Sequence, residues 1–414
     1  MSALLIIAAL TAQAGPATNT GGPAVSEKTK RKEGGETYLD FEGSAGYSSN
    51  PTNSAINHEA SAFGRIALHG VHSRVSDRSS SLLSVYGENV SYTNHQGSQQ
   101  SLSLYGRHDT SVTEHVRLFV DANANYQENG QLGTRVLVLP EIPPVIPGTV
   151  TPPILVPPSG DFLSVTGHEF SFGANGGGSF ALGPKDGLSV SSGFRRVVFH
   201  NGPVRSDYNT VPVSLSYDRQ LSPRASVGTR LSAEQTNYSG PLNYRLITPQ
   251  LTGHVQLAQH LNLSGAIGVS FARVDNGITI RHTTGLAAQV SLCGLGEGSS
   301  FCTHAAANED TATTAGPSRS IGGGVEYARQ LDANQSIAFS LGYTHYSTPV
   351  SVFTATSFSS SNYASVAGSY SRRIGNRLFG GINLSGQKVT HNGPDPKADL
   401  TASLFIRYRF GDVL

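Results

Sequence analysis

The chain lacks any apolar run of about 18 residues or more, and this absence excludes a protein that crosses a membrane on hydrophobic helices. It also lacks a strong net charge: the formal value is +1 at pH 7, which offers no case for a nucleic-acid partner. Tryptophan is absent, and Met1 is the only methionine. Glycine is abundant, with 47 of 414 residues, and 37% of the residues are hydrophobic. This balance suits a sheet whose strands each carry one polar face.

Cysteine is scarce as well, because Cys293 and Cys302 are the only two. They lie close together in a segment rich in glycine and serine. In an oxidising compartment they would close a short disulfide loop, and two free thiols are the alternative. His304 and Asp310 lie nearby, but their spacing fits no zinc pattern. We therefore predict a disulfide, no metal and no cofactor.

The most informative segment is Leu400–Phe410, near the end of the chain. Its even-numbered residues are apolar and end in the aromatic pair Tyr408 and Phe410. Its odd-numbered residues are mostly polar and include Arg407 and Arg409. Side chains alternate between the two faces of a strand, so one face of this segment is apolar and the other polar.

The same alternation recurs along most of the chain and predicts about sixteen strands. Fourteen or eighteen also stay open, because the phase is irregular near 81–93, 99–110 and 187–200. The connections alternate between tight turns and longer or variable loops, of which 129–161 is rich in proline and 276–317 carries both cysteines. This pattern predicts an all-β fold: a single antiparallel transmembrane β-barrel with short periplasmic turns and long external loops.

The first residues are typical of an export signal. An apolar stretch covers 3–10, and Ala12-Gln13-Ala14 fits the small-x-small rule for cleavage. We expect residues 1–14 to be a signal peptide. Residues 15–35 are rich in Gly, Pro, Lys and Glu and predict a disordered periplasmic lead-in. The barrel is then expected to occupy residues 36–414.

The export signal, the alternation of tight turns with longer loops, and the segment Leu400–Phe410 together resemble bacterial outer-membrane β-barrel proteins of the porin-like kind. No motif points to a subfamily. The resemblance implies a place in the outer membrane of a Gram-negative cell, with outer-membrane lipids, lipopolysaccharide and the barrel-assembly machinery as partners. In this family an aromatic final residue serves as the assembly signal. Tyr408 and Phe410 are the candidates here, although the chain continues to Leu414. A homo-oligomer stays open.

About sixteen strands would enclose a lumen too wide for side chains to fill. The sequence thus predicts a water-filled, charged channel for the passive diffusion of small polar solutes. These charges either select solutes or pair with one another as structural braces, and both interpretations stay open. The candidate pore-lining residues are the titratable members of the polar faces: Asp40, Glu42, Arg65, His69, Arg117, Asp121, Arg230, Glu234, Glu326, Arg407 and Arg409.

Other functions remain as alternatives. Either long loop would constrict the pore if it folded inward, or would be exposed to phage, host or neighbouring cells. The barrel would otherwise export a polysaccharide or another polymer, or act as a structural or adhesive surface protein with an occluded lumen. The tripeptide His345-Tyr346-Ser347 resembles the His-x-Ser element of outer-membrane lipid A deacylases, but it stands alone. We predict no enzymatic activity.

Overall fold

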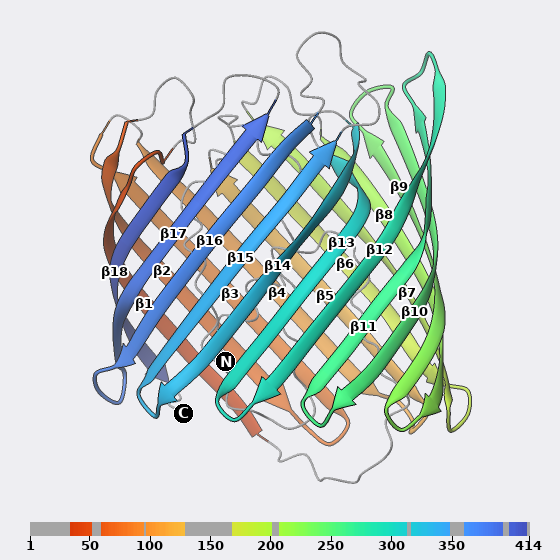
Figure 1. Cartoon of the computed structure of the whole chain (residues 1–414), viewed down its shortest axis with the longest axis horizontal. Coiled ribbons are helices and arrows are strands. Elements are labelled where there is room, and N and C mark those ends of the chain that lie inside the picture. Colours follow the sequence, from red (N-terminus) through yellow and green to blue (C-terminus); the bar gives the residue numbers. More distant parts are fainter. Residues whose placement is uncertain are drawn as a thin grey trace.

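The computed structural model describes residues 34–51, 59–94, 97–128, 168–200, 207–312, 316–347, 360–391 and 397–411, which form 18 strands and parts of their connections. None of these residues forms a helix long and apolar enough to cross a membrane. The strands, shown in Figure 1, are β1 (Gly34–Ser48), β2 (Ser61–Val75), β3 (Ser79–Tyr92), β4 (Ser98–Ser111), β5 (Val116–Glu128), β6 (His168–Ala181), β7 (Asp186–His200), β8 (Tyr208–Ser222), β9 (Ala225–Tyr238), β10 (Asn243–Ala258), β11 (Leu261–Asp275), β12 (Ile280–Gly296), β13 (Ser299–Ala312), β14 (Gly316–Asp332), β15 (Gln335–Ser347), β16 (Ser360–Arg373), β17 (Leu378–His391) and β18 (Asp399–Gly411).

The strands form one closed antiparallel sheet. Each strand pairs with its neighbours along the chain, and β1 also pairs with β18 from Tyr38 opposite Gly411 to Ser48 opposite Thr401. Figure 1 shows the resulting barrel, with tilted strands around a single ring. Closure pairs the first strand with the last, so the backbone groups of β1 and β18 find partners within the wall. The predicted all-β antiparallel barrel is confirmed.

The predicted number of strands, about sixteen, is wrong, and the structure has 18, which the sequence had left open. The error lies in 276–317, which was expected to be a long loop and instead contains the hairpin of β12 and β13. The hairpin turn at 297–298 follows a glycine-rich strand end and includes Gly298 at a φ of 66°. Glycine adopts this left-handed conformation without the steric cost that other residues meet. The dense glycine and serine around this turn explain why the segment resembled a loop.

The two ends of the barrel differ as predicted. Connections from an even-numbered to an odd-numbered strand contain two to four residues, whereas those from odd to even vary widely. In outer-membrane barrels the short turns are periplasmic and the longer loops external. We therefore call the odd-to-even side the external end. The proline-rich loop 129–161 and residues 1–33 lie outside the described residues, so the inward fold of that loop, the signal peptide and the lead-in stay predictions.

The outer face of the barrel is apolar. On β18, Leu404 is 64% exposed and Phe410 50%, whereas Arg409 on the opposite face is 2% exposed. The rings of Tyr408 and Phe410 pack edge to face on the outer surface, with centroids 4.7 Å apart. The same apolar outer face recurs on the other strands. Exposing so much apolar area to water is unfavourable, so this outer surface requires a lipid environment. The role of the aromatic pair in assembly stays a prediction.

The disulfide between Cys293 and Cys302 is present, but not in a long external loop. The two cysteines are direct cross-strand partners of β12 and β13, three residues from the tight turn of that hairpin. They therefore lie at the periplasmic end of the barrel. Cys302 is buried on the inner face, beside Glu326 of β14. The predicted bond is confirmed, and its expected place in a loop is wrong.

We expect the double substitution Cys293→Ser/Cys302→Ser to lower the free energy of unfolding by about 2 kcal/mol, since the cross-link closes a short loop. The barrel should still fold, because nine residue pairs join β12 to β13 without it. Urea titration of the refolded protein in lipid vesicles, with and without a reductant, measures the change. A variant that fails to fold would contradict this prediction.

Candidate functional site

The inner wall of the barrel holds the predicted pore-lining residues. Their side chains all lie on the inner faces of their strands, opposite the exposed apolar residues. Seven of them are buried: Asp40, Glu42, Arg65, His69, Arg230, Arg407 and Arg409. The other four, Arg117, Asp121, Glu234 and Glu326, are partly exposed.

One group of these residues joins the first strand to the last, and we call it the closure cluster: Tyr38, Asp40, Phe379, Arg407 and Arg409. Asp40 and Arg409 are direct partners across β1 and β18. Nε and Nη2 of Arg409 donate to the two carboxylate oxygens of Asp40 at 2.7 and 2.8 Å. The Arg409 guanidinium lies 4.4 Å from the ring centroid of Tyr38, and that of Arg407 lies 5.0 Å from the ring centroid of Phe379. Such two-point pairing fixes both the register and the orientation of the strands.

A second group surrounds Arg65, and we call it the Arg65 cluster: Glu42, Arg65, Tyr86, Glu88 and Ser101. Arg65 donates to Glu42 on β1 at 2.5 Å and to Glu88 on β3 at 2.8 Å. It also donates to the Tyr86 hydroxyl at 2.6 Å. The Tyr86 and Ser101 hydroxyls donate to Glu88 at 2.6 and 3.0 Å. One guanidinium thus joins three neighbouring strands, and its side chain is 1% exposed.

His69 lies between the two clusters. Its Nε2 is 3.3 Å from the hydroxyl of Ser84, and its ring meets those of Tyr38 and Tyr86 at centroid distances of 6.0 and 6.3 Å. The inner wall from β18 to β3 is therefore one continuous band of paired charges and aromatic rings. Sequence reasoning found the charged members on β1, β2 and β18. It missed Tyr86 and Glu88, because Leu82 and Val90 share the inner face of β3 and blur its alternation.

A smaller charged group lies on β4 and β5. Arg107 donates to both carboxylate oxygens of Asp109 at 2.7 and 3.0 Å, and the sequence signalled neither residue. Arg117 lies 3.5 Å from Asp109, and its side chain is 43% exposed. Asp121 accepts a bond of 3.4 Å from Asn175 on β6. Arg117 is therefore a predicted residue in this group whose side chain remains accessible to solutes.

The remaining predicted residues lie apart from these clusters. Arg230 and Glu234 are on β9, across the ring from β1. Glu234 accepts a bond from Thr236 at 3.2 Å. Glu326 lies beside Cys302 and Ser340 on the inner wall. Among the described residues, the ion pairs join groups on the same strand or on adjacent strands, so they run along the wall and not across the lumen.

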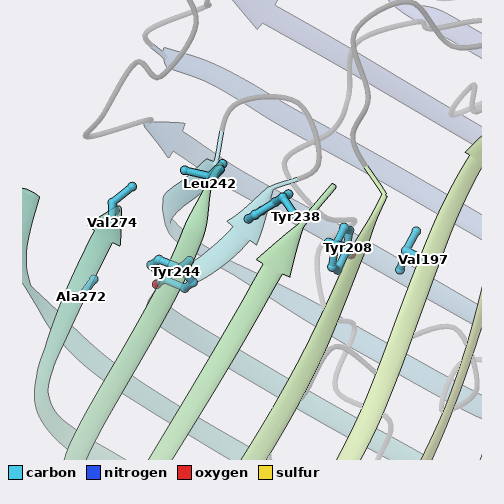
Figure 2. Close-up of a cluster of buried hydrophobic side chains, with 7 residues drawn as sticks. All are labelled: Val197, Tyr208, Tyr238, Leu242, Tyr244, Ala272 and Val274. Carbon is cyan, nitrogen blue, oxygen red and sulfur yellow. The ribbon is translucent and has the colours of Figure 1, made fainter. Parts of the chain in front are cut away.

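An apolar cluster, which the sequence reasoning missed, lies on the inner wall at the external ends of β7 to β11. Figure 2 shows its side chains gathered near the strand ends. The rings of Tyr208 and Tyr238 pack 5.5 Å apart, and Tyr244 is fully buried. The inner face is therefore not uniformly polar. The buried members of this inner apolar cluster are Val197, Tyr208, Tyr238, Leu242, Tyr244, Ala272 and Val274.

The segment His345-Tyr346-Ser347 ends β15 at the external side. Nδ1 of His345 lies 2.7 Å from the side-chain oxygen of Asn362, and the described contacts include no bond from this ring to Ser347. Tyr346 is buried on the inner face against Val389. The histidine is thus engaged by β16 and not by the serine that the tripeptide would need.

No family profile matches the sequence, and no curated protein matches it. Among solved structures, OccAB4 of Acinetobacter baumannii is similar with a TM-score of 0.43 and 10% identity, covering 92% of this chain and 99% of that one. OccK2 (OpdF) of Pseudomonas aeruginosa, solved with glucuronate, gives 0.45 and 10%, covering 91% and 98%. The siderophore receptor PirA of Pseudomonas aeruginosa gives 0.40 and 10%, covering 92% and 81%. Because these TM-scores are below 0.5, the similarity carries no argument by itself. The evidence for the fold is the strand pairing and the apolar outer face of this chain, which are those of a bacterial outer-membrane β-barrel protein.

Proposed function

We propose that the chain is an outer-membrane channel that lets small polar solutes diffuse passively through a charged, water-filled lumen. The observation that carries this proposal is the size of the ring: 18 strands close one barrel. About eight strands already enclose an interior that side chains can fill, and barrels of 16 to 18 strands leave an aqueous channel. The apolar outer face supports insertion in lipid, and the polar positions of the inner face support a path for hydrated solutes.

One observation favours a second function, a surface barrel with an occluded lumen. Arg409 with Asp40 in the closure cluster, and Arg65 with Glu42 in the Arg65 cluster, are buried ion pairs. Groups used in this way brace the wall and are not offered to a passing solute. The two functions differ in a single measurable property, the flow of ions through the folded barrel.

We expect the refolded protein to produce stable, ohmic conductance steps in a planar bilayer, with a size that follows the ionic strength. A water-filled lumen conducts in this way because hydrated ions cross it without being bound. Folding is checked on the same sample by heat-modifiable mobility on a gel. A folded barrel that conducts nothing would overturn the channel and favour the occluded barrel.

The partly exposed guanidinium of Arg117 allows a second test, in which the ion selectivity of the channel is measured. Arg117→Glu should shift the reversal potential in a salt gradient toward cations, because a fixed charge on the inner wall changes sign. Arg245 offers a matched control, since it lies at the external end of β10 on the outer face. Arg245→Glu should leave the reversal potential unchanged. Equal shifts in both variants would contradict a conducting lumen lined by Arg117.

A further inference from the structure

The wall of the barrel is incompletely paired between β12 and β13. β12 pairs with β11 along its length up to Ile280, and β13 pairs with β14 up to Ala312. Between β12 and β13, however, the pairing stops at Ala288 opposite Ala307. Among the described residues, 283–287 and 308–312 therefore have a strand partner on one side alone, and we call this gap the side seam. The seam lies toward the external ends of β12 and β13, and unpaired backbone of this kind is costly wherever lipid surrounds it.

Side chains hold the seam closed where the backbone does not. Glu309 of β13 is buried and accepts bonds from Ser270 at 2.7 Å and from Thr283 at 3.0 Å. Arg319 of β14 donates from Nη2 to the carbonyl oxygen of Thr284 at 2.8 Å. These bonds join β13 and β14 to β11 and β12. Side-chain hydrogen bonds of this kind can break while the backbone hydrogen bonds between paired strands stay intact.

Arg319 also has unused binding capacity. Its Nε is buried and has no hydrogen-bond partner among the described contacts. The guanidinium lies against Gly285, where a Cβ would come within 2.7 Å of Nη2. The glycine thus makes room for it. Arg319 is a partly exposed guanidinium whose Nε donor is unpaired, and such a group favours an anion that can accept two bonds at once.

Apolar surface lies on both sides of the seam. On the outer face, a hollow of about 830 Å³ reaches the foot of the seam at Ala288 and Ala307. Both small residues such as Gly253 and larger ones such as Ile267 and Ile321 line it. On the inner face, the inner apolar cluster of Figure 2 ends at Ala272 and Val274, which are cross-strand partners of Thr283 and Arg281 beside the seam.

We propose that the side seam is a lateral portal for a single-chain amphiphile with an anionic head group. The head binds Arg319, and the apolar chain passes from the inner apolar cluster through the seam into the hollow that faces the lipid. The charge of Arg319 and the apolar character of the two flanking surfaces select this class of ligand. The portal is distinct from the axial path for polar solutes and does not depend on it.

The test uses the full-length barrel in vesicles whose outer leaflet is lipopolysaccharide, with dansyl-undecanoic acid as the anionic probe and its methyl ester as the neutral one. Arg319→Gln should slow the protein-dependent transfer of the acid by about tenfold or more, since bonds to a charged group are lost. Transfer of the ester should not change. Arg329→Gln on the same strand is the matched control, because Arg329 is exposed at the periplasmic end, and it should behave like the unchanged protein.

A cross-link tests the movement itself. Thr283→Cys/Glu309→Cys joined by a short bis-maleimide should lose the protein-dependent transfer of both probes, compared with the same sample before cross-linking. The control pair Ser369→Cys/Asn383→Cys bridges β16 and β17, where these residues are direct partners within a fully paired region. It should transfer both probes equally before and after cross-linking. If Arg319→Gln transfers the acid as fast as Arg329→Gln does, or the closed seam still passes the probes, the portal is refuted.

Discussion

Asp40→Ala is expected to lower the free energy of unfolding by about 3–5 kcal/mol, because it leaves the buried guanidinium of Arg409 without its carboxylate. The pair joins the first strand to the last, and both side chains are 3% exposed. Loss of either partner therefore weakens the junction between β1 and β18 that closes the ring. The chain has no tryptophan, so unfolding in lipid vesicles is best followed by far-ultraviolet circular dichroism and by mobility on a gel.

Asp121→Ala is the matched control, since Asp121 is also an inner-wall aspartate but is partly exposed and has one weak bond of 3.4 Å. It should cost less than about 1 kcal/mol, as partly exposed polar contacts usually do. The exchange Asp40→Arg/Arg409→Asp should recover part of the loss, because the same two groups meet across β1 and β18. Equal losses in Asp40→Ala and Asp121→Ala would show that the closure cluster does not stabilise the ring.

The fold was predictable from the period of two in the strands, and its error has a physical reason. The check on strand number was the alternation of tight turns and variable loops. Overlooking one whole hairpin preserves that alternation, so the check could detect a single missing strand but not the pair β12 and β13. The alternation is present in β12, where Leu286, Ala288 and Val290 face outward. It was obscured by the glycine and serine near Gly298.

For the candidate site, the sequence predicted which face of its strand each residue occupies, but not which residues contact one another. Parity identified Asp40 and Arg409 as inward residues, but they are separated by 369 positions in the sequence. Their contact depends on which strands meet when the ring closes and on the register between them. Register follows from the pairing of whole strands and the lengths of the loops, and no single residue encodes it. The partners of Arg65 on β3 were missed for another reason, because Leu82 and Val90 share the inner face of that strand and blur its alternation.

Arg65→Ala should be as severe as the loss of Asp40, again about 3–5 kcal/mol, because it leaves Glu42 and Glu88 close together without the shared cation. Glu88 would keep the hydroxyls of Tyr86 and Ser101, which soften the loss but carry no charge. Arg117→Ala is the control, as its guanidinium is 43% exposed and should contribute about 0–1 kcal/mol. Urea titration in vesicles compares the two variants directly.

Neutralising Glu42 and Glu88 distinguishes a loss of stability caused by their mutual repulsion from one caused by the lost packing of the Arg65 side chain. The triple variant Arg65→Met/Glu42→Gln/Glu88→Gln should regain most of the stability, since a buried ion pair replaced by uncharged groups of similar size is often neutral. Recovery would identify Arg65 as a brace, and the reversal potential of a conducting triple variant should then match that of the unchanged barrel. Recovered stability with an altered reversal potential would instead show that Arg65 also acts on ions in the lumen. The same residues can thus distinguish a wall that is only held together by its charges from one that uses them to select.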